Sequence, residues 1–244
     1  MIDIHCHLLP GVDDGPRDAR DSVDLARALA GEGVTAVVAT PHRLNPLFPR
    51  ATAERVALAA GVARDAIRDA GIELRVEIGA EVVLAAGVVD EILADPSLTI
   101  GGAGRYVLLE IPAYGMGFLP CLVDVVFRAR SEGITPVLAH VERYAEFQEE
   151  PGLLEDLRER GALIQVTGAA LAGRYGSDDQ RAARLFMKRG LVDVLASDAH
   201  DAARRPPFWK ESMREAERLV GKERALALSV ENPGHVAGGV PWPA

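Results

Sequence analysis

The stretch FLPCLVDVVFRARSEGITPVLAHVER, residues 118–143, contains the unit from which the fold is predicted. Residues 118–132 have the pattern of an amphipathic helix, and Gly133 follows at the position of a C-terminal cap. Residues 135–139 are an apolar run with the length of a buried strand. The stretch therefore predicts a helix that leads into a strand, and polar side chains follow directly at the strand's end.

The same unit recurs along the chain. Strands are predicted at 2–5, 35–39, 74–78, 106–111, 135–139, 163–166 and 192–196. Helices are predicted at 18–32, 51–70, 87–94, 118–132, 151–160, 178–189 and 208–220, and glycines follow six of them at 33, 71, 133, 161, 190 and 221. Alternating strands and helices indicate right-handed βαβ units and a parallel sheet, either open and doubly wound or closed. We expect an α/β fold, a distorted TIM-like (β/α)7 barrel.

Composition limits the class of protein. The 244 residues are predicted to form one domain, 1–244, and the interior must be mainly aliphatic because 48% of residues are hydrophobic but only 5% are aromatic. A net charge of −9 argues against nucleic acid as a partner. The chain has no apolar run of membrane-spanning length and no signal-peptide pattern, which predicts a cytoplasmic protein without membrane insertion.

Polar residues gather where the predicted strands end, which is where parallel α/β folds carry their chemistry. The candidate metal ligands at this edge are His5, His7, Asp14, His42, Glu81, Glu110, His140, Asp198 and His200. Each has an ordinary explanation when taken singly: an isolated HxH is often incidental, "DDG" is a common turn, and a carboxylate can form an ion pair or a helix cap. Independent accidents would not all fall at the same end of consecutive strands, so the set predicts a metal cluster.

Nine ligands are too many for one ion that keeps an open position, and are enough for two or three ions with bridging carboxylates. Mixed imidazole and carboxylate ligation favours Mn, Fe, Zn or Co over Mg and Ca. Cys6 is excluded as a ligand because it points to the opposite face of the strand from His5 and His7.

Arginines indicate which reaction such a site performs. Multinuclear sites serve displacement at phosphorus or hydrolysis at carbon, and a guanidinium group matches a phosphoryl group. Arg143 follows His140, and Arg204 and Arg205 follow His200, although Arg143 can also pair with neighbouring glutamates. We therefore favour phosphomonoester hydrolysis. Neither cysteine is followed by the arginine that a cysteine-dependent phosphatase requires six residues later, so that mechanism is excluded.

Six motifs are similar to those of a known family. They are DIHCHLLPGVDDG (3–15), TPH (40–42), GAE (79–81), LLEIP (108–112), LAHVERY (138–144) and ASDAH with RPP (196–200 and 205–207). Together they resemble the PHP (polymerase and histidinol phosphatase) superfamily, and specifically its bacterial CpsB/YwqE-type tyrosine-protein phosphatases. The resemblance implies a distorted (β/α)7 barrel with three divalent ions, usually Mn²⁺. It also implies action on the phosphotyrosine tail of a membrane-bound tyrosine autokinase that controls capsule and exopolysaccharide synthesis.

The resemblance further implies a role for each site residue. The first ion would be held by His5, His7 and Asp198, the second by Glu110 and His140 with Glu81 bridging, and the third by Asp14, His42 and His200. Arg143 and Arg205 would bind the phosphate, which a hydroxide activated by the ions attacks. We expect the catalytic residues to be Arg143, Arg205, Asp198 and His200.

The chain departs from the family pattern at residues 43–50, RLNPLFPR, where the family often has a second histidine and a loop with Gly and Tyr. His235 has no counterpart in the pattern and is expected to be a tail residue. Two alternative functions stay open: a PHP phosphatase for a small molecule such as histidinol phosphate, and a non-catalytic module that docks onto a kinase.

Overall fold

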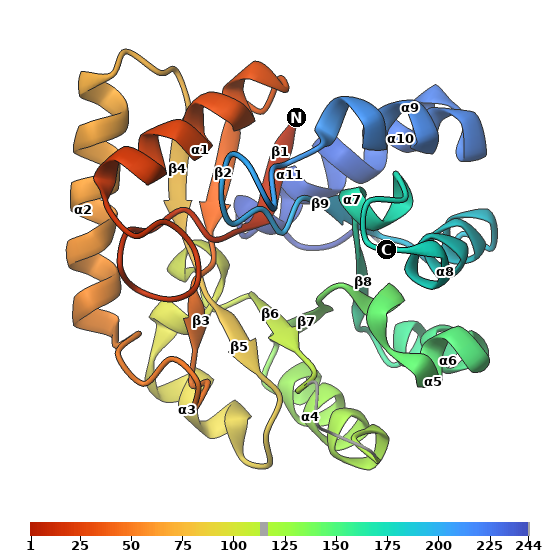
Figure 1. Cartoon of the computed structure of the whole chain (residues 1–244). Helices are drawn as coiled ribbons and strands as arrows, with labels where there is room; N and C mark the ends of the chain where they lie inside the picture. Colours follow the sequence, from red (N-terminus) through yellow and green to blue (C-terminus); the bar gives the residue numbers. More distant parts are fainter. Residues whose placement is uncertain (113–116, 244) are drawn as a thin grey trace.

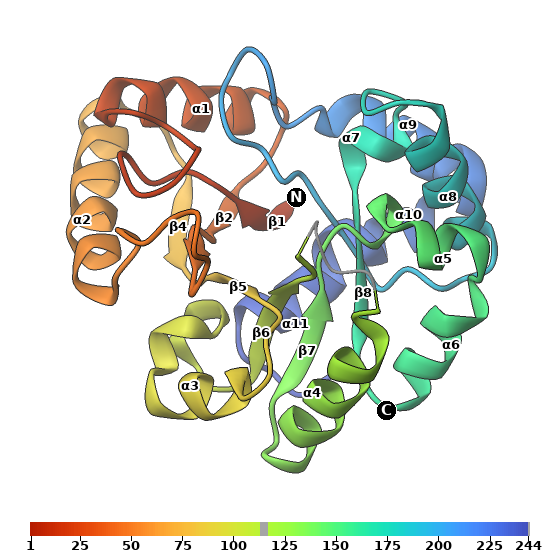
Figure 2. The ribbon, with the colours of Figure 1, turned by 60° about the horizontal axis from the view of Figure 1, so that its bottom comes forward.

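The structure is a computed structural model, and it describes residues 1–112 and 117–243. Strands occupy the middle of the molecule and helices surround them (Figures 1 and 2). Every strand pairing in the described chain is parallel. The expected α/β architecture with parallel sheets is therefore confirmed.

The strands form two sheets. One has the order β1 (Ile2–Cys6), β2 (Ala36–Ala39), β4 (Arg75–Ile78). The other has the order β3 (His42–Arg43), β5 (Glu81–Val83), β6 (Tyr106–Glu110), β7 (Thr135–Leu138), β8 (Leu163–Thr167), β9 (Val194–Ala196). The helices between them are α1 (Ala19–Gly31), α2 (Ala53–Asp69), α3 (Val88–Ala94), α4 (Leu119–Ser131), α5 (Ala145–Glu149), α6 (Gly152–Glu159), α7 (Gly168–Leu171), α8 (Ser177–Lys188), α9 (Trp209–Val220), α10 (Lys222–Leu226) and α11 (Asn232–Ala237). Single turns η1 (Pro96–Leu98), η2 (Ile100–Gly102) and η3 (Val141–Arg143), and a π-helical turn, η4 (Ala227–Glu231), complete the elements.

Two of the seven expected strands are each followed by a second short strand that was not expected. The second expected strand corresponds to β2, and β3 follows it after Thr40 and Pro41; the third corresponds to β4, and β5 follows it after Gly79 and Ala80. Pro41 has no N–H to donate to a ladder, although its carbonyl still accepts from Glu81 N at 3.1 Å. The interruption lets the ends of both strands change direction next to the candidate ligands His42 and Glu81.

Contacts between β1 and β9 link the two sheets. Cys6 and Ala199 form an isolated parallel bridge, Asp198 N donates to His5 O at 2.8 Å, and His7 N donates to Ala199 O at 2.8 Å. Within the described residues, β4 pairs with β2 alone, and η2 packs beside it. A Cβ on Gly79 would lie 3.1 Å from Ile100 Cα, a tight contact that glycine avoids. A closed barrel is not confirmed.

A small apolar cluster fills the space between the strands away from the candidate ligands. It consists of Ile4, Val38, Ile100, Tyr106, Leu108, Val137, Ala139, Leu163, Val194, Ala196 and Val236. The C-terminal segment covers this cluster, since Val236 belongs to α11 and Tyr106 Oη donates to Val240 O at 2.6 Å. A larger cluster lies between strands and helices. Among the helices described, none combines the length and apolar character needed to cross a bilayer.

Candidate metal centre

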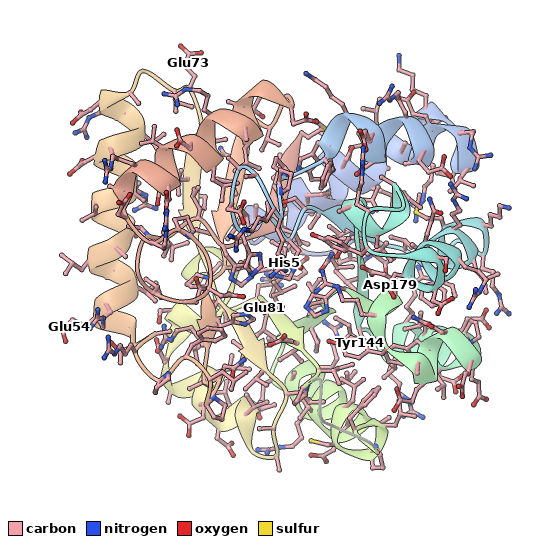
Figure 3. All side chains as sticks on the ribbon, viewed as in Figure 1. His5, Glu54, Glu73, Glu81, Tyr144 and Asp179 are labelled. Atoms are coloured by element: carbon pink, nitrogen blue, oxygen red, sulfur yellow. The ribbon has the colours of Figure 1, made fainter. Side chains whose placement is uncertain are left out.

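The structure brings all nine candidate ligands together at the carboxyl ends of the strands. Figure 3 shows His5 and Glu81 in the middle of the molecule, whereas Glu54 and Glu73 lie at its outer edge. The buried members are His5, His7, His42, Glu81, His140, Asp198 and His200, with Glu110 partly buried and Asp14 the most exposed at 42%. Residues from almost 200 positions apart in the sequence thus share one site because parallel strands end at a common edge.

Glu81 lies at the centre of the group. Its two carboxylate oxygens face four imidazoles: His140 Nε2 at 2.9 Å, His42 Nδ1 at 3.0 Å, and His5 Nε2 and His7 Nε2 at 3.3 Å each. Glu81 Oε1 therefore faces His5 and His140, and Glu81 Oε2 faces His7 and His42. This placement suits a carboxylate shared between two cations.

Four groups of side chains have ligand atoms close enough to hold an ion. They are His7, Asp14, His42 and His200; His5, Glu81 and His140; His5, His7 and Asp198; and His42, Glu81 and Glu110. His5, His7 and Asp198 lie together, as expected for the first ion. Asp14, His42 and His200 also lie together, as expected for the third. Glu110 differs, because it lies with His42 rather than with His140.

Four imidazole nitrogens that face this space have no hydrogen-bond partner among the described residues. They are His5 Nε2, His7 Nε2, His42 Nδ1 and His200 Nε2. A buried polar atom without a partner is costly, so its place in a folded protein needs an explanation. Lone pairs of neutral imidazoles beside ionised carboxylates fit divalent cations, and the residues present therefore suit a metal cluster.

Two side chains fix the orientation of the first pair of imidazoles. Asp13 Oδ2 accepts from His7 Nδ1 at 2.7 Å, and Gln165 Oε1 accepts from His5 Nδ1 at 3.0 Å. Gln165 Oε1 also accepts from His140 N at 3.0 Å. With the proton held on Nδ1, each ring presents Nε2 to the cluster, as in the carboxylate–histidine pairs of metal sites.

The other imidazoles are held in a similar way. His200 Nδ1 donates to the Asp198 carbonyl at 3.0 Å. His140 Nδ1 lies 3.2 Å from the hydroxyl of Tyr144, which in turn donates to Ile111 O at 2.9 Å and so accepts from the ring. Both rings therefore present Nε2 to the carboxylates.

The central carboxylates stay ionised. Burial raises the pKa of Glu81, but the imidazoles of His5, His140 and His7 that face it lower it by more, so the pKa lies well below its usual range. Burial acts in the same direction on Asp198, and the positive charge of Arg143 together with the neighbouring His5 ring brings the pKa well below its usual range. Two buried carboxylates that face the same two imidazoles, His5 and His7, favour a cation at this place.

The backbone is strained at two candidate ligands. His140 has φ 35° and Asp198 has φ 51°, in the left-handed region that residues with a Cβ rarely adopt. Each costs about 1 kcal/mol or more and persists only where the surroundings enforce it. Both residues follow the end of a strand, and the turn directs their side chains toward the cluster.

Gly15 allows the Asp13–Asp14 turn to lie against His7. A Cβ on Gly15 would be 2.6 Å from His7 O and 3.0 Å from His7 Cβ, which is closer than atoms can approach. Gly15 N also donates to Asp13 Oδ1 at 3.0 Å. The glycine of the DDG motif therefore brings both aspartates to the site.

Two arginines meet at Asp198. Arg143 Nη2 and Arg205 Nη2 both donate to Asp198 Oδ2, the latter at 2.8 Å, while Asp198 Oδ1 faces His5 and His7. Their side chains keep 27% and 33% exposure, so solvent reaches them. Arg204 is exposed, and its backbone N–H donates to Asp201. Arg205 rather than Arg204 is thus the arginine at the site.

The unusual loop at 43–50 contacts two candidate ligands. The Phe48 ring stacks on His42 with centroids 4.7 Å apart and planes 1° apart, and Asn45 Nδ2 donates to Glu110 Oε2 at 3.4 Å. Leu47 is 68% exposed beside them. The loop therefore forms part of the rim of the site. His235, in α11, lies outside all four candidate groups.

Sequence reasoning did not assign roles to Asp13, Gln165 and Tyr144. Asp13 was visible as the first half of a carboxylate pair, and Gln165 was visible as a polar side chain within the apolar run LIQVT. A buried polar residue in such a strand requires a partner, which is the signal that identifies Gln165. The interaction of Tyr144 with His140 depends on a turn that no periodic pattern predicts.

These features define a protein with a candidate multinuclear metal centre on a parallel α/β fold. The chain belongs to the CpsB/CapC family of capsular polysaccharide synthesis, whose model matches residues 1–237. The recognition of this family from the motifs is thereby confirmed.

Individual relatives agree with this assignment. The chain is 34% identical over 230 residues to tyrosine-protein phosphatase YwqE of Bacillus subtilis, covering 94% of this chain and 89% of the relative. It is 28% identical over 246 residues to tyrosine-protein phosphatase CpsB of Streptococcus pneumoniae, covering 96% of each. A crystal structure from work on YwqE and CpsB, described as unique metal-dependent tyrosine phosphatases, superposes with a TM-score of 0.89 at 32% identity, covering 99% of this chain and 96% of that one.

A more distant similarity concerns the fold alone. L-hydantoinase from Arthrobacter aurescens superposes with a TM-score of 0.56 at 14% identity, covering 98% of this chain and 71% of that one. Its similarity supports the parallel α/β architecture.

Proposed function

We propose that this protein is a metal-dependent protein-tyrosine phosphatase that hydrolyses phosphotyrosine monoesters. The observation that carries the proposal is the double role of Asp198. Its Oδ1 faces the Nε2 atoms of His5 and His7, which have no hydrogen-bond partner among the described residues, while its Oδ2 accepts from Arg143 and Arg205. The Asp198 carboxylate thus connects the candidate cation ligands with the two arginines that would bind phosphate. The relatives that match nearly the whole chain are named tyrosine-protein phosphatases, which supports the same reaction.

The nine clustered side chains would hold the cations. We assign this role to His5, His7, Asp14, His42, Glu81, Glu110, His140, Asp198 and His200, and propose three divalent ions, with Mn²⁺ as the metal. Bound ions of this kind neutralise phosphoryl charge and lower the pKa of water. Asp13 and Gln165 hold His7 and His5 in the tautomer that leaves Nε2 free for an ion.

Arg143 and Arg205 would bind the phosphoryl group. Burial lowers the pKa of Arg143, but Asp198 and Glu142 raise it by more, so its guanidinium keeps its charge. When a phosphate dianion enters, both guanidinium groups exchange one acceptor, Asp198 Oδ2, for phosphoryl oxygens. The charge that accumulates on those oxygens during hydrolysis then faces fixed donors. Asp198 and His200 complete the proposed catalytic set, because Asp198 receives both arginines and His200 Nδ1 lies 3.6 Å from Asp198 Oδ1.

The proposed substrate is the phosphotyrosine tail of a membrane-bound tyrosine autokinase that controls capsule and exopolysaccharide synthesis, met by this enzyme in the cytoplasm. Membership of a capsular polysaccharide synthesis family supports this choice. A small phosphomonoester such as histidinol phosphate is the second candidate, because the loop at 43–50 changes the rim without changing the ligands.

Parallel assays separate the candidates. We expect the Mn²⁺-loaded protein to hydrolyse a phosphotyrosine peptide with a kcat/KM well above that for histidinol phosphate, and to lose activity with a chelator. Preference for histidinol phosphate would support the second candidate. Absence of both activities after Mn²⁺ is restored would leave only the docking role, which binding of the protein to a tyrosine autokinase without hydrolysis would identify.

A further inference from the structure

Tyr175 lies against the two arginines of the site. It belongs to the loop between α7 and α8, and the Arg143 guanidinium carbon lies 5.3 Å from the centre of its ring. A guanidinium over an aromatic ring is attracted by the ring's negative face. The ring of Tyr175 therefore supports Arg143, which also pairs with Asp198.

The hydroxyl of Tyr175 has no hydrogen-bond partner among the described residues, although the oxygen is buried. The groups that act on it are Asp198, through its charge alone, and Arg205 and Arg143, whose guanidinium groups can only donate hydrogen bonds. Neither arginine can accept the phenolic proton. The hydroxyl is thus a donor without an acceptor, beside two groups that are also donors.

We propose that Tyr175 is a third phosphate-binding side chain, whose hydroxyl donates a hydrogen bond to an oxygen of the phosphoryl group bound by Arg143 and Arg205. A phosphoryl group supplies the acceptor that the Tyr175 hydroxyl lacks and also accepts from both arginines, because each of its oxygens accepts more than one hydrogen bond. The inference rests on the proposed phosphatase function and adds a substrate contact to it.

The charge state of Tyr175 agrees with this role. Burial and the negative charge of Asp198 raise the pKa of the phenol against the lowering effect of Arg205, so the hydroxyl keeps its proton at neutral pH. The ring and the hydroxyl have separable tasks: the ring holds Arg143 in place, and the hydroxyl binds the substrate.

The test compares Tyr175→Phe, which keeps the ring and removes the hydroxyl, with the unchanged protein. A matched control is Tyr106→Phe, which removes a buried hydroxyl at the far end of the strands, where it donates to Val240 O. Two quantities are measured on Mn²⁺-loaded protein: kcat/KM for a phosphotyrosine peptide, and the Kd of inorganic phosphate by calorimetry. Metal content is determined for each variant.

For Tyr175→Phe we expect kcat/KM to fall and the Kd of phosphate to rise, each by about ten- to a hundredfold, as for loss of a hydrogen bond to a charged group. Metal content stays unchanged, and Tyr106→Phe leaves both quantities at their original values. Unchanged phosphate affinity and kcat/KM in Tyr175→Phe would overturn the inference. Failure of the unchanged protein to hydrolyse the peptide would instead contradict the proposed function, and phosphate binding would still decide whether Tyr175 contacts the anion.

Discussion

His7 Nδ1 donates to Asp13 Oδ2 at 2.7 Å, and this hydrogen bond joins a candidate ligand to the neighbour of another. Asp13 is buried and also accepts from the backbone of His42 at 3.0 Å and of Gly15 at 3.0 Å. One carboxylate therefore orients His7 and anchors two segments of the site, although its own oxygens belong to none of the four candidate ion groups.

Asp13→Asn is expected to weaken metal binding. The amide can still accept from His7, but it lacks the charge that makes His7 a better ligand. We expect Mn²⁺ affinity to fall by about ten- to a hundredfold, the usual effect of changing an outer partner of a ligating histidine. Competition with a chromophoric chelator measures the change. The control is Asp21→Asn, which alters an exposed pair with Arg17; equal affinities in the two variants would contradict the role given to Asp13.

Gly15→Ala is expected to displace the turn that carries Asp13 and Asp14, because the added Cβ would overlap His7 O. We expect destabilisation by about 1–3 kcal/mol, as for other forced overlaps in packed regions, together with weaker metal binding. The matched control is Gly31→Ala at the end of α1, where an added Cβ would meet no atom within 4 Å. That variant should be neutral or more stable by about 0.4–1 kcal/mol. Urea unfolding measures both, and a stability of Gly15→Ala equal to that of the control would refute the close packing.

Gln165→Leu is expected to leave two buried donors, His5 Nδ1 and His140 N, without their acceptor. The predicted cost is about 1–3 kcal/mol of stability for each group left unsatisfied, and His5 loses its fixed orientation. Gln165→Glu keeps an acceptor at the same place and should retain more metal affinity than Gln165→Leu. Thermal unfolding and metal titration follow the two effects. Metal affinity in Gln165→Leu as high as in the unchanged protein would show that His5 needs no such support.

Asp95 gives a prediction about pH. Hydrogen bonds from Ser97 and the charge of Arg43 lower the pKa of Asp95 in the folded protein. A lowered pKa means that the carboxylate contributes stability above its ordinary pKa of about 4, and that this contribution disappears as the pH falls through the lowered value. The stability difference between the unchanged protein and Asp95→Asn should therefore shrink in acid. Because Asp95 is 35% exposed, the difference should not exceed about 1 kcal/mol. A stability difference that grows on acidification would contradict a lowered pKa of Asp95 in the folded protein.

Much of the fold could be predicted because its signals are periodic. The expected strand at 135–139 and helix at 118–132 correspond closely to β7 and α4. The short strands β3 and β5 were not predicted, although Pro41 lies at the first break and Gly79 at the second. The short helices α5 and α7 were also missed, since five and four residues are too few to show a helical period.

The position of the site could be predicted more fully than its arrangement. Ligand candidates were visible because histidines and carboxylates follow apolar strands. The pairing of Glu110 with His42 could not be foreseen, because it depends on where β3 resumes after the break at Pro41. The residue pattern alone does not separate Arg204 from Arg205, and only the family resemblance favoured Arg205; in the structure the difference depends on a turn held by Asp201.

The central claim is that imidazoles and carboxylates from separate strands hold several cations through Glu81. Its most direct test is the metal content, by plasma mass spectrometry, of the unchanged protein and of Glu81→Gln after equilibration with Mn²⁺ and removal of free metal. We predict about three ions per chain in the unchanged protein, the number proposed for the nine ligands, and the loss of at least one in Glu81→Gln because Glu81 would be shared by two of them. An unchanged protein that retains no metal, or a variant that retains as much as the unchanged protein, would contradict the account.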